Sequence, residues 1–153
     1  MFCGSKVLKA ISNKIKSFKN RDISQEQIER AVSTAKAGDC KELNDLLNKK
    51  ASKVAQQVRA ENPNWTKMRQ GSEIHKRMSY SLNTIKEFDL NSYGRADGID
   101  DIVGIIFELR PFTPKSMLAG LKQLDRYEQG ALRHQDLQKI TNWIKILITY
   151  DTN

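Results

Sequence analysis

GRADGIDDIVGIIFELRPFTP (residues 94–114) contains an apolar strand pattern with charged residues inside it, followed by the start of a helix. The strand has the period of two that a β-strand requires, in which two sets of side chains face opposite ways: Val103, Ile105, Phe107 and Leu109 against Ile106, Glu108 and Arg110. Glu108 is the informative residue, because a carboxylate in such a strand is costly to bury unless it is paired or bound to a cation.

The segments around this strand predict an ordered series of elements. Thr113 and Pro114 predict a helix start, and a helix continues toward residue 133 with Leu118, Leu121 and Leu124 on its apolar face. WIKILITY (residues 143–150) predicts a final strand. Upstream, a helix is expected over residues 71–86 from the spacing of Ile74, Met78, Leu82 and Ile85, and extended segments follow it. The predicted order is helix, three strands, helix, strand.

Residues 1–62 read as a helical extension of a core at residues 63–153, within one compact domain. A basic amphipathic helix is expected over residues 6–19. Ser24 with Gln27, and Asp39 with Glu42, predict capping boxes that begin two further helices. The second helix ends at Asn62–Pro63 and carries an apolar stripe that predicts either core or a homodimer seam: Leu43, Leu46, Leu47, Val54, Ala55 and Val58.

The composition limits the classes of function. The 153 residues include 26 Lys and Arg against 18 Asp and Glu, a net charge of +8, which favours nucleic acid or an anionic membrane as partner. No transmembrane segment is expected, since no run approaches the roughly 20 apolar residues that one needs, and the start lacks a signal-peptide pattern. Cys3 and Cys40 lack metal or redox spacing; they are expected to be small apolar side chains, with one bridge between them left open.

Asp97 and Glu108 are the candidate chemical centre. Two facing carboxylates make a hard oxygen site suited to Mg²⁺ or Mn²⁺. Alternation puts Arg110 on the face of Glu108, so the alternative is a salt bridge of Glu108 with Arg110 or Lys115. Of the two histidines, His75 is a weaker candidate for a substrate contact, and His134 is expected to be a surface residue.

Residues 93–127 resemble the PD-(D/E)XK nuclease core of bacterial polymorphic toxins and interbacterial effectors. The resemblance is carried by GRAD, by a strand ending in ELRP where the family has Glu-Leu-Lys-Pro, and by a helix with Gln-x-x-x-Tyr. It implies an α/β (α+β), restriction-endonuclease-like fold with extra N-terminal helices. It also implies a role for each matching residue: Asp97, Glu108, the Leu109 carbonyl and Glu73 at the metal, and Gln123 and Tyr127 lining the site. Arg110 stands where the family has lysine.

The resemblance implies a metal-dependent DNase acting as an antibacterial toxin, blocked by an immunity protein. A bacterial secretion system would deliver it to the target-cell cytoplasm. Two alternatives remain: a ribonuclease toxin that cuts transfer RNA, and an inactive module that binds nucleic acid or membrane. For Glu73 the alternative is simply a favourable acid in a first helical turn. Contacts to the nucleic-acid backbone are expected from Lys76, Arg77, Arg95, Lys115, Lys122 and Arg126.

Overall fold

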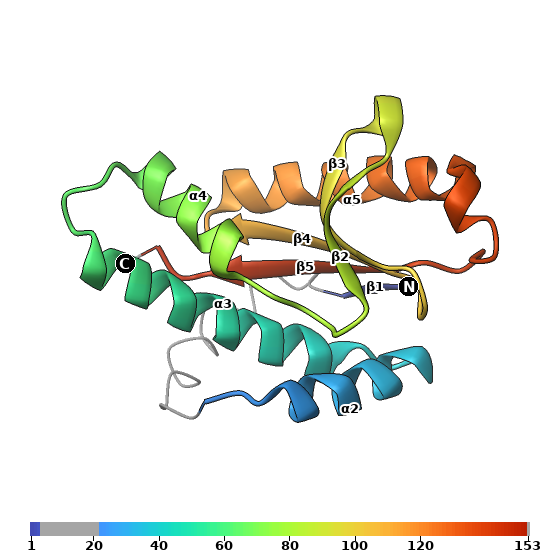
Figure 1. Cartoon of the computed structure of the whole chain (residues 1–153), viewed down its shortest axis with the longest axis horizontal. Helices are drawn as coiled ribbons and strands as arrows, with labels where there is room; N and C mark the ends of the chain where they lie inside the picture. The colour runs from blue at the N-terminus through green and yellow to red at the C-terminus, as the bar shows by residue number, and fades with distance from the viewer. Residues whose placement is uncertain (4–21, 153) are drawn as a thin grey trace.

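The computed structural model describes residues 1–3 and 22–152, in which helices flank a single sheet (Figure 1). The sheet order is β1-β5-β4-β3-β2, with β2, β3 and β4 antiparallel in succession and β4, β5 and β1 parallel. The strands are β1 (Phe2–Cys3), β2 (Thr84–Asp89), β3 (Arg95–Asp100), β4 (Ile105–Pro111) and β5 (Ile144–Tyr150). The helices are α2 (Gln25–Lys36), α3 (Lys41–Glu61), α4 (Lys67–Arg77) and α5 (Pro114–Arg133), with 3₁₀ turns η1 (Asn91–Tyr93) and η2 (Gln135–Leu137).

Two apolar cores lie on opposite faces of the sheet. One core packs α2, α3 and α4 against the face that carries Phe107 and Leu109. The other packs α5 against the face that carries Ile106 and Leu147. From α4 onward the order is helix, three strands, helix, strand, so the predicted α+β, restriction-endonuclease-like fold is confirmed.

The connection from β4 to β5 was predicted well. Thr113 caps α5 by accepting a hydrogen bond from the Ser116 amide, and Pro114 occupies the first helical turn. The buried face of α5, however, is set by Met117, Gly120, Leu124 and Tyr127. Leu118 is 61% exposed, so its assignment to the apolar stripe was wrong.

Helix α4 differs from the predicted helix at residues 71–86. It begins at Lys67, where Thr66 accepts from the Arg69 amide, and it ends at Arg77. Ile74 and Met78 are buried as expected, but Leu82 is 72% exposed. The chain turns at residues 78–83 and Ile85 lies in β2. Leu82 and Ile85 thus keep the spacing of a helix by coincidence, although one lies in a turn and the other in a strand.

Helix α3 covers the free edge of β5 as well as its face. Its side chains form hydrogen bonds with backbone groups of β5, and of Asp151 just after it, at intervals of one helical turn. Asn44 Nδ2 donates to the Leu147 carbonyl, Asn48 Oδ1 accepts from the Thr149 amide, and Ser52 Oγ accepts from the Asp151 amide. An uncovered edge would invite pairing with another chain. The apolar stripe of α3 packs into this chain's own core. Of the two expectations for this stripe, core or homodimer seam, the structure therefore shows the core.

The helix starts were only partly predicted. The Ser24–Gln27 capping box is present. The expected box at Asp39 and Glu42 is wrong, because α3 begins after Cys40 and Asp39 instead accepts from the Lys41 amide. The expected helix at residues 6–19 lies outside the described residues. Neither α3 nor α5, nor any other helix of the described ranges, combines the length and apolar character of a membrane span.

Cys3 and Cys40 form a disulfide, which corrects the expectation of two small apolar side chains. The bridge ties β1, and with it the edge of the sheet, to the start of α3. The cysteines are 37 residues apart, and closing a loop of that length stabilises a fold by about 4 kcal/mol. We expect the Cys3→Ser, Cys40→Ser double variant to lose about this much free energy of unfolding in urea titrations. Equal stability of the oxidised and reduced chains would contradict the bridge.

Candidate active site

The site lies where the pairing between β3 and β4 ends. The two strands are in register from Asp100–Ile105 to Gly98–Phe107, and no further pair follows. Leu109, two residues beyond Phe107, therefore presents its amide and carbonyl to side chains rather than to β3. Asp97 Oδ2 accepts from the Leu109 amide at 2.7 Å, and His75 Nε2 lies 3.1 Å from the Leu109 carbonyl oxygen. The gap between the strands is lined by polar groups from β3, β4 and α4.

Asp97 and Glu108 meet in this gap, as the sequence predicts. Their carboxyl groups lie close enough for each to shift the pKa of the other. Burial, followed by the hydrogen bond and charge of Asp97, raises the pKa of Glu108 to about 9, against an opposing effect of Arg110. Burial also opposes ionisation of Asp97, but hydrogen bonds from His75 and Glu108 outweigh it and lower the pKa of Asp97. Glu108 is therefore the more readily protonated of the two acids.

Arg110 lies beside Glu108 on the same face of β4. Its Nε and Nη2 are both 2.9 Å from Glu108 Oε2. The salt bridge that the sequence offers as the alternative to a metal site is therefore present, but it leaves the Asp97–Glu108 contact in place. Two side chains thus compete for Glu108: a guanidinium on one side and a carboxylate on the other.

Helix α5 approaches this face closely through glycine. A Cβ at Gly120 would lie 3.0 Å from Arg110 Cγ and 3.6 Å from Glu108 Cγ. Tyr127, two turns later, is 6% exposed, and burial followed by the charges of Glu108 and Asp97 raises its pKa to about 12. Gln123 lies between these two residues on α5 and is half-buried. Of the predicted pair Gln123 and Tyr127, Tyr127 lies close enough to the two acids for their charges to raise its pKa.

Two tyrosines near the acids were missed in the sequence. Tyr80, before β2, stacks on Phe107 with ring centroids 4.9 Å apart. Burial, with smaller effects of Asp97 and Glu108, raises the pKa of Tyr80. Tyr150, at the end of β5, has its pKa raised by burial and more weakly by Asp97. Neither residue lies in a motif, and only the tertiary fold brings them near the acids.

Glu73 is not brought to the acid pair. Its carboxylate is 3.1 Å from Arg77 Nε, and Arg77 Nη2 is 2.7 Å from Glu61 on α3. Because His75 is two residues further along α4, it faces the site while Glu73 faces away from it. Among the other predicted contacts, Arg126 donates to the Ser92 carbonyl. The remaining cations are exposed: Lys76, Arg95, Lys115 and Lys122.

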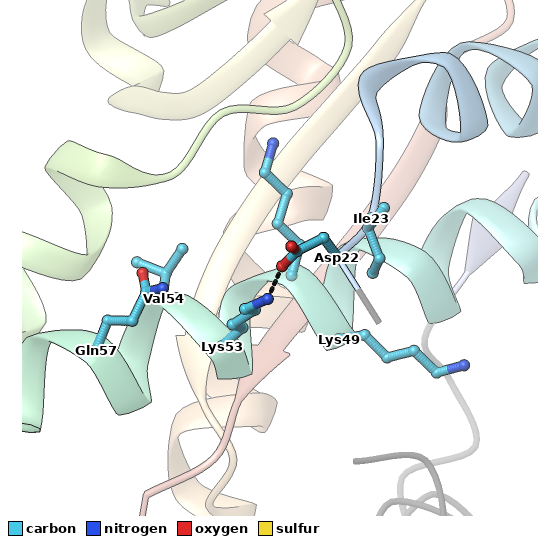
Figure 2. Close-up of a pocket in the computed structure, with 7 residues that line it drawn as sticks. Asp22, Ile23, Lys49, Lys53, Val54 and Gln57 are labelled. Atoms are coloured by element: carbon cyan, nitrogen blue, oxygen red, sulfur yellow. Dashed lines mark ion pairs between the residues drawn. The ribbon is translucent and has the colours of Figure 1, made fainter. Parts of the chain in front are cut away.

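A separate cavity of about 290 Å³ opens beside α3 and the segment that precedes α2 (Figure 2). Asp22 forms an ion pair with Lys53 across it, and Lys50 Nζ donates to Ser79. The cavity has a single carboxylate, so it lacks the paired acids of the site above. Its lining is Asp22, Ile23, Lys49, Lys50, Lys53, Val54 and Gln57.

Comparison with known proteins agrees with this geometry. Residues 64–150 match a protein family described as restriction endonuclease fold toxin 9, and the match covers more than half of the chain. The chain belongs to this family. No curated protein and no solved structure matches it. The matched range contains α4, the four longer strands and α5, and therefore the whole Asp97–Glu108 site.

Membership in the restriction endonuclease fold toxin 9 family identifies the chain as a nuclease toxin. Nucleases of this fold typically use divalent metals. Within residues 1–3 and 22–152, no group of three or more His, Cys, Asp or Glu side chains converges to hold a metal ion. A metal at this site would therefore depend on two carboxylates together with backbone oxygen.

Proposed function

We propose that this chain is a metal-dependent DNase in which Asp97 and Glu108 hold Mg²⁺ or Mn²⁺, with the Leu109 carbonyl as a third ligand. The observation that carries the proposal is the close approach of two carboxyl groups between β3 and β4, in which Glu108 is buried and Asp97 is half-buried. Two carboxyl groups this close share a proton when no cation neutralises them. A divalent cation would take the place of that proton, so the donor set fits a hard metal ion. We leave Glu73 out of the ligand set because Arg77 holds it elsewhere.

When bound, the metal would supply Lewis acidity to the phosphate and lower the pKa of a water molecule. The remaining work falls to the chain's own side chains. Arg110 would neutralise charge that develops on the phosphate, because a guanidinium stays protonated and cannot act as a base. Tyr127, which is 6% exposed, would cover the site on the side of α5 and limit the access of water to the acids. Exposed Arg95, Lys115 and Lys122 would contact the backbone of the nucleic acid without reading its sequence.

The substrate and the metal requirement are tested in one assay. Plasmid DNA and total RNA are incubated with the purified chain in Mg²⁺ buffer, with and without EDTA. We expect cleavage of DNA that EDTA abolishes and that Asp97→Asn removes. Asp101→Asn, an exposed acid after β3, is the matched control and should cut like the parent. Cleavage of RNA alone would replace the DNase assignment by the ribonuclease one, and absence of metal-dependent cutting would support the inactive module.

Arg110 gives a prediction of its own. Arg110→Ala should lower the cleavage rate by about 10²-fold, because the loss of one charge-stabilising donor has typically this effect. Arg110→Lys restores the family's residue and keeps a cation beside Glu108, so we expect at least a tenth of the parent rate. Initial rates on supercoiled plasmid measure both. If alanine and lysine have equal effects, the positive charge at this position is irrelevant to the chemistry.

The toxin family supports a proposal for the biological setting. A bacterial secretion system would deliver the chain, which would act in the cytoplasm of a target cell. A cognate immunity protein would block it, and the +8 charge favours an acidic surface on that partner and fast, salt-sensitive association. Expression in the bacterial cytoplasm should be toxic, and co-expression of the neighbouring gene should relieve the toxicity. Toxicity that this gene leaves unchanged would count against it as the immunity protein.

A further inference from the structure

His75 has a fixed orientation at the edge of the acid pair. Its Nδ1 lies 3.0 Å from the Gly71 carbonyl oxygen, one turn earlier in α4, and its Nε2 lies 3.1 Å from the Leu109 carbonyl oxygen. Nε2 is also 3.6 Å from Asp97 Oδ1. Carbonyl oxygens only accept hydrogen bonds, so both ring nitrogens act as donors here. The Gly71 contact anchors the ring to its own helix, and Nε2–H is aimed at the site.

The acceptors that surround Nε2–H are groups that the proposed metal would use. A bound cation would compete with Nε2–H for the lone pairs of Leu109 O and the Asp97 carboxylate, because its charge would be the largest at the site. His75 stays in place because its Gly71 contact lies outside the ligand set. That competition would leave Nε2–H available to another acceptor near the same position. A non-bridging oxygen of a phosphate at the Asp97–Glu108 site is the acceptor that a substrate would bring.

We propose that His75 is a catalytic residue that donates Nε2–H to a non-bridging oxygen of the scissile phosphate. This inference rests on the proposed metal-dependent nuclease function. A second hydrogen-bond donor to the phosphate is useful here because Arg110 already directs both Nε and Nη2 at Glu108 Oε2. With that guanidinium partly committed, His75 supplies a second donor from the opposite side of the strand gap. Its neighbour Glu73 cannot share the role because Arg77 holds it.

The test compares His75→Ala and His75→Gln with His134→Gln as the matched control. His134 caps the turn η2 by accepting from the Asp136 amide, and its ring packs edge-on against Phe88. Three quantities are measured on the full chain: kcat on duplex DNA, Mn²⁺ affinity without DNA, and Tm. We expect kcat of His75→Ala to fall about 10²-fold, as for loss of one transition-state donor. The kcat of His75→Gln should fall less, because the glutamine amide can still donate a hydrogen bond. The Mn²⁺ affinity of both variants should stay within about twofold of that of the parent.

A phosphorothioate substrate separates a phosphate contact from a structural effect. Sulfur at the non-bridging position is a poorer acceptor, so the parent should slow on one diastereomer, and this penalty should shrink in His75→Ala. A kcat equal to that of the parent would overturn the inference, as would a Mn²⁺ affinity weakened tenfold or an unchanged sulfur penalty. If Asp97→Asn still cuts DNA, the proposed function fails. If Asp97→Asn is inactive and His75→Ala cuts normally, only the role of His75 fails.

Discussion

We expect replacement of Glu108 with glutamine to abolish the proposed metal-dependent cleavage while leaving the fold intact. The amide keeps the shape and the hydrogen-bonding capacity of the protonated acid that the buried site already holds. It cannot supply the negative oxygen that a divalent ion needs. Loss of several kcal/mol of transition-state stabilisation corresponds to a fall in kcat of about 10³-fold or more. Plasmid cleavage at saturating Mg²⁺ measures the loss, with the exposed Glu42→Gln as control. Activity within tenfold of the parent would contradict a metal role for Glu108.

The same variant makes a prediction about pH and stability. The pKa of Glu108 is about 9 in the folded chain, above its ordinary value in the unfolded chain, so folding favours the protonated form. Its contribution to stability is complete at acid pH and is lost as pH rises toward 9. Glutamine does not titrate, so in EDTA Glu108→Gln should be more stable than the parent at pH 8–9 and similar at pH 5. Mg²⁺ should raise the Tm of the parent and not of the variant.

Helix α3 is the second place where a large effect is expected. Leu47 is fully buried between α3 and the sheet, so Leu47→Ala should lower the free energy of unfolding by about 2–5 kcal/mol. Leu82→Ala is the matched control, since Leu82 is 72% exposed and should tolerate the change. Urea titrations followed by circular dichroism give both values. Equal losses for the two variants would mean that α3 contributes no core.

Removing residues 1–62 should have a larger effect than any single substitution. The remaining chain would lose the buried stripe of α3 and the side chains that take up the backbone of β5. We therefore expect residues 63–153 alone to aggregate or to remain unfolded. A cooperative unfolding transition at the Tm of the full chain would instead support an extension that the nuclease core does not need.

Much of the core could be predicted because its signals are local. The strand at β4, the cap at Thr113–Pro114 and the final strand each depend on neighbouring residues. The meeting of Asp97 with Glu108 was also expected, because alternation in β4 and the GRAD motif placed both at one strand pair. Arg110 was placed correctly on the face of Glu108 for the same reason.

The features that were missed depend on long-range contacts. The predicted helix extends to residue 86 because Leu82 and Ile85 continue the helical spacing of apolar residues. The structure ends α4 at Arg77 and exposes both residues, which only the three-dimensional packing shows. His75 and Glu73 share one helix, and the sequence could not tell which of them faces β4. The structure pairs Glu73 with Arg77 and gives the site to His75. The disulfide was left open because cysteines 37 residues apart have no local pattern.

The central claim is that Asp97 and Glu108 hold one divalent ion together. Its most direct test is a crystal of the chain soaked in Mn²⁺, with data collected at the manganese absorption edge. We expect one anomalous peak between β3 and β4, bonded to both carboxylates at roughly 2.1–2.3 Å. No peak at saturating Mn²⁺, or a peak that touches neither carboxylate while the Glu108–Arg110 ion pair persists, would contradict it.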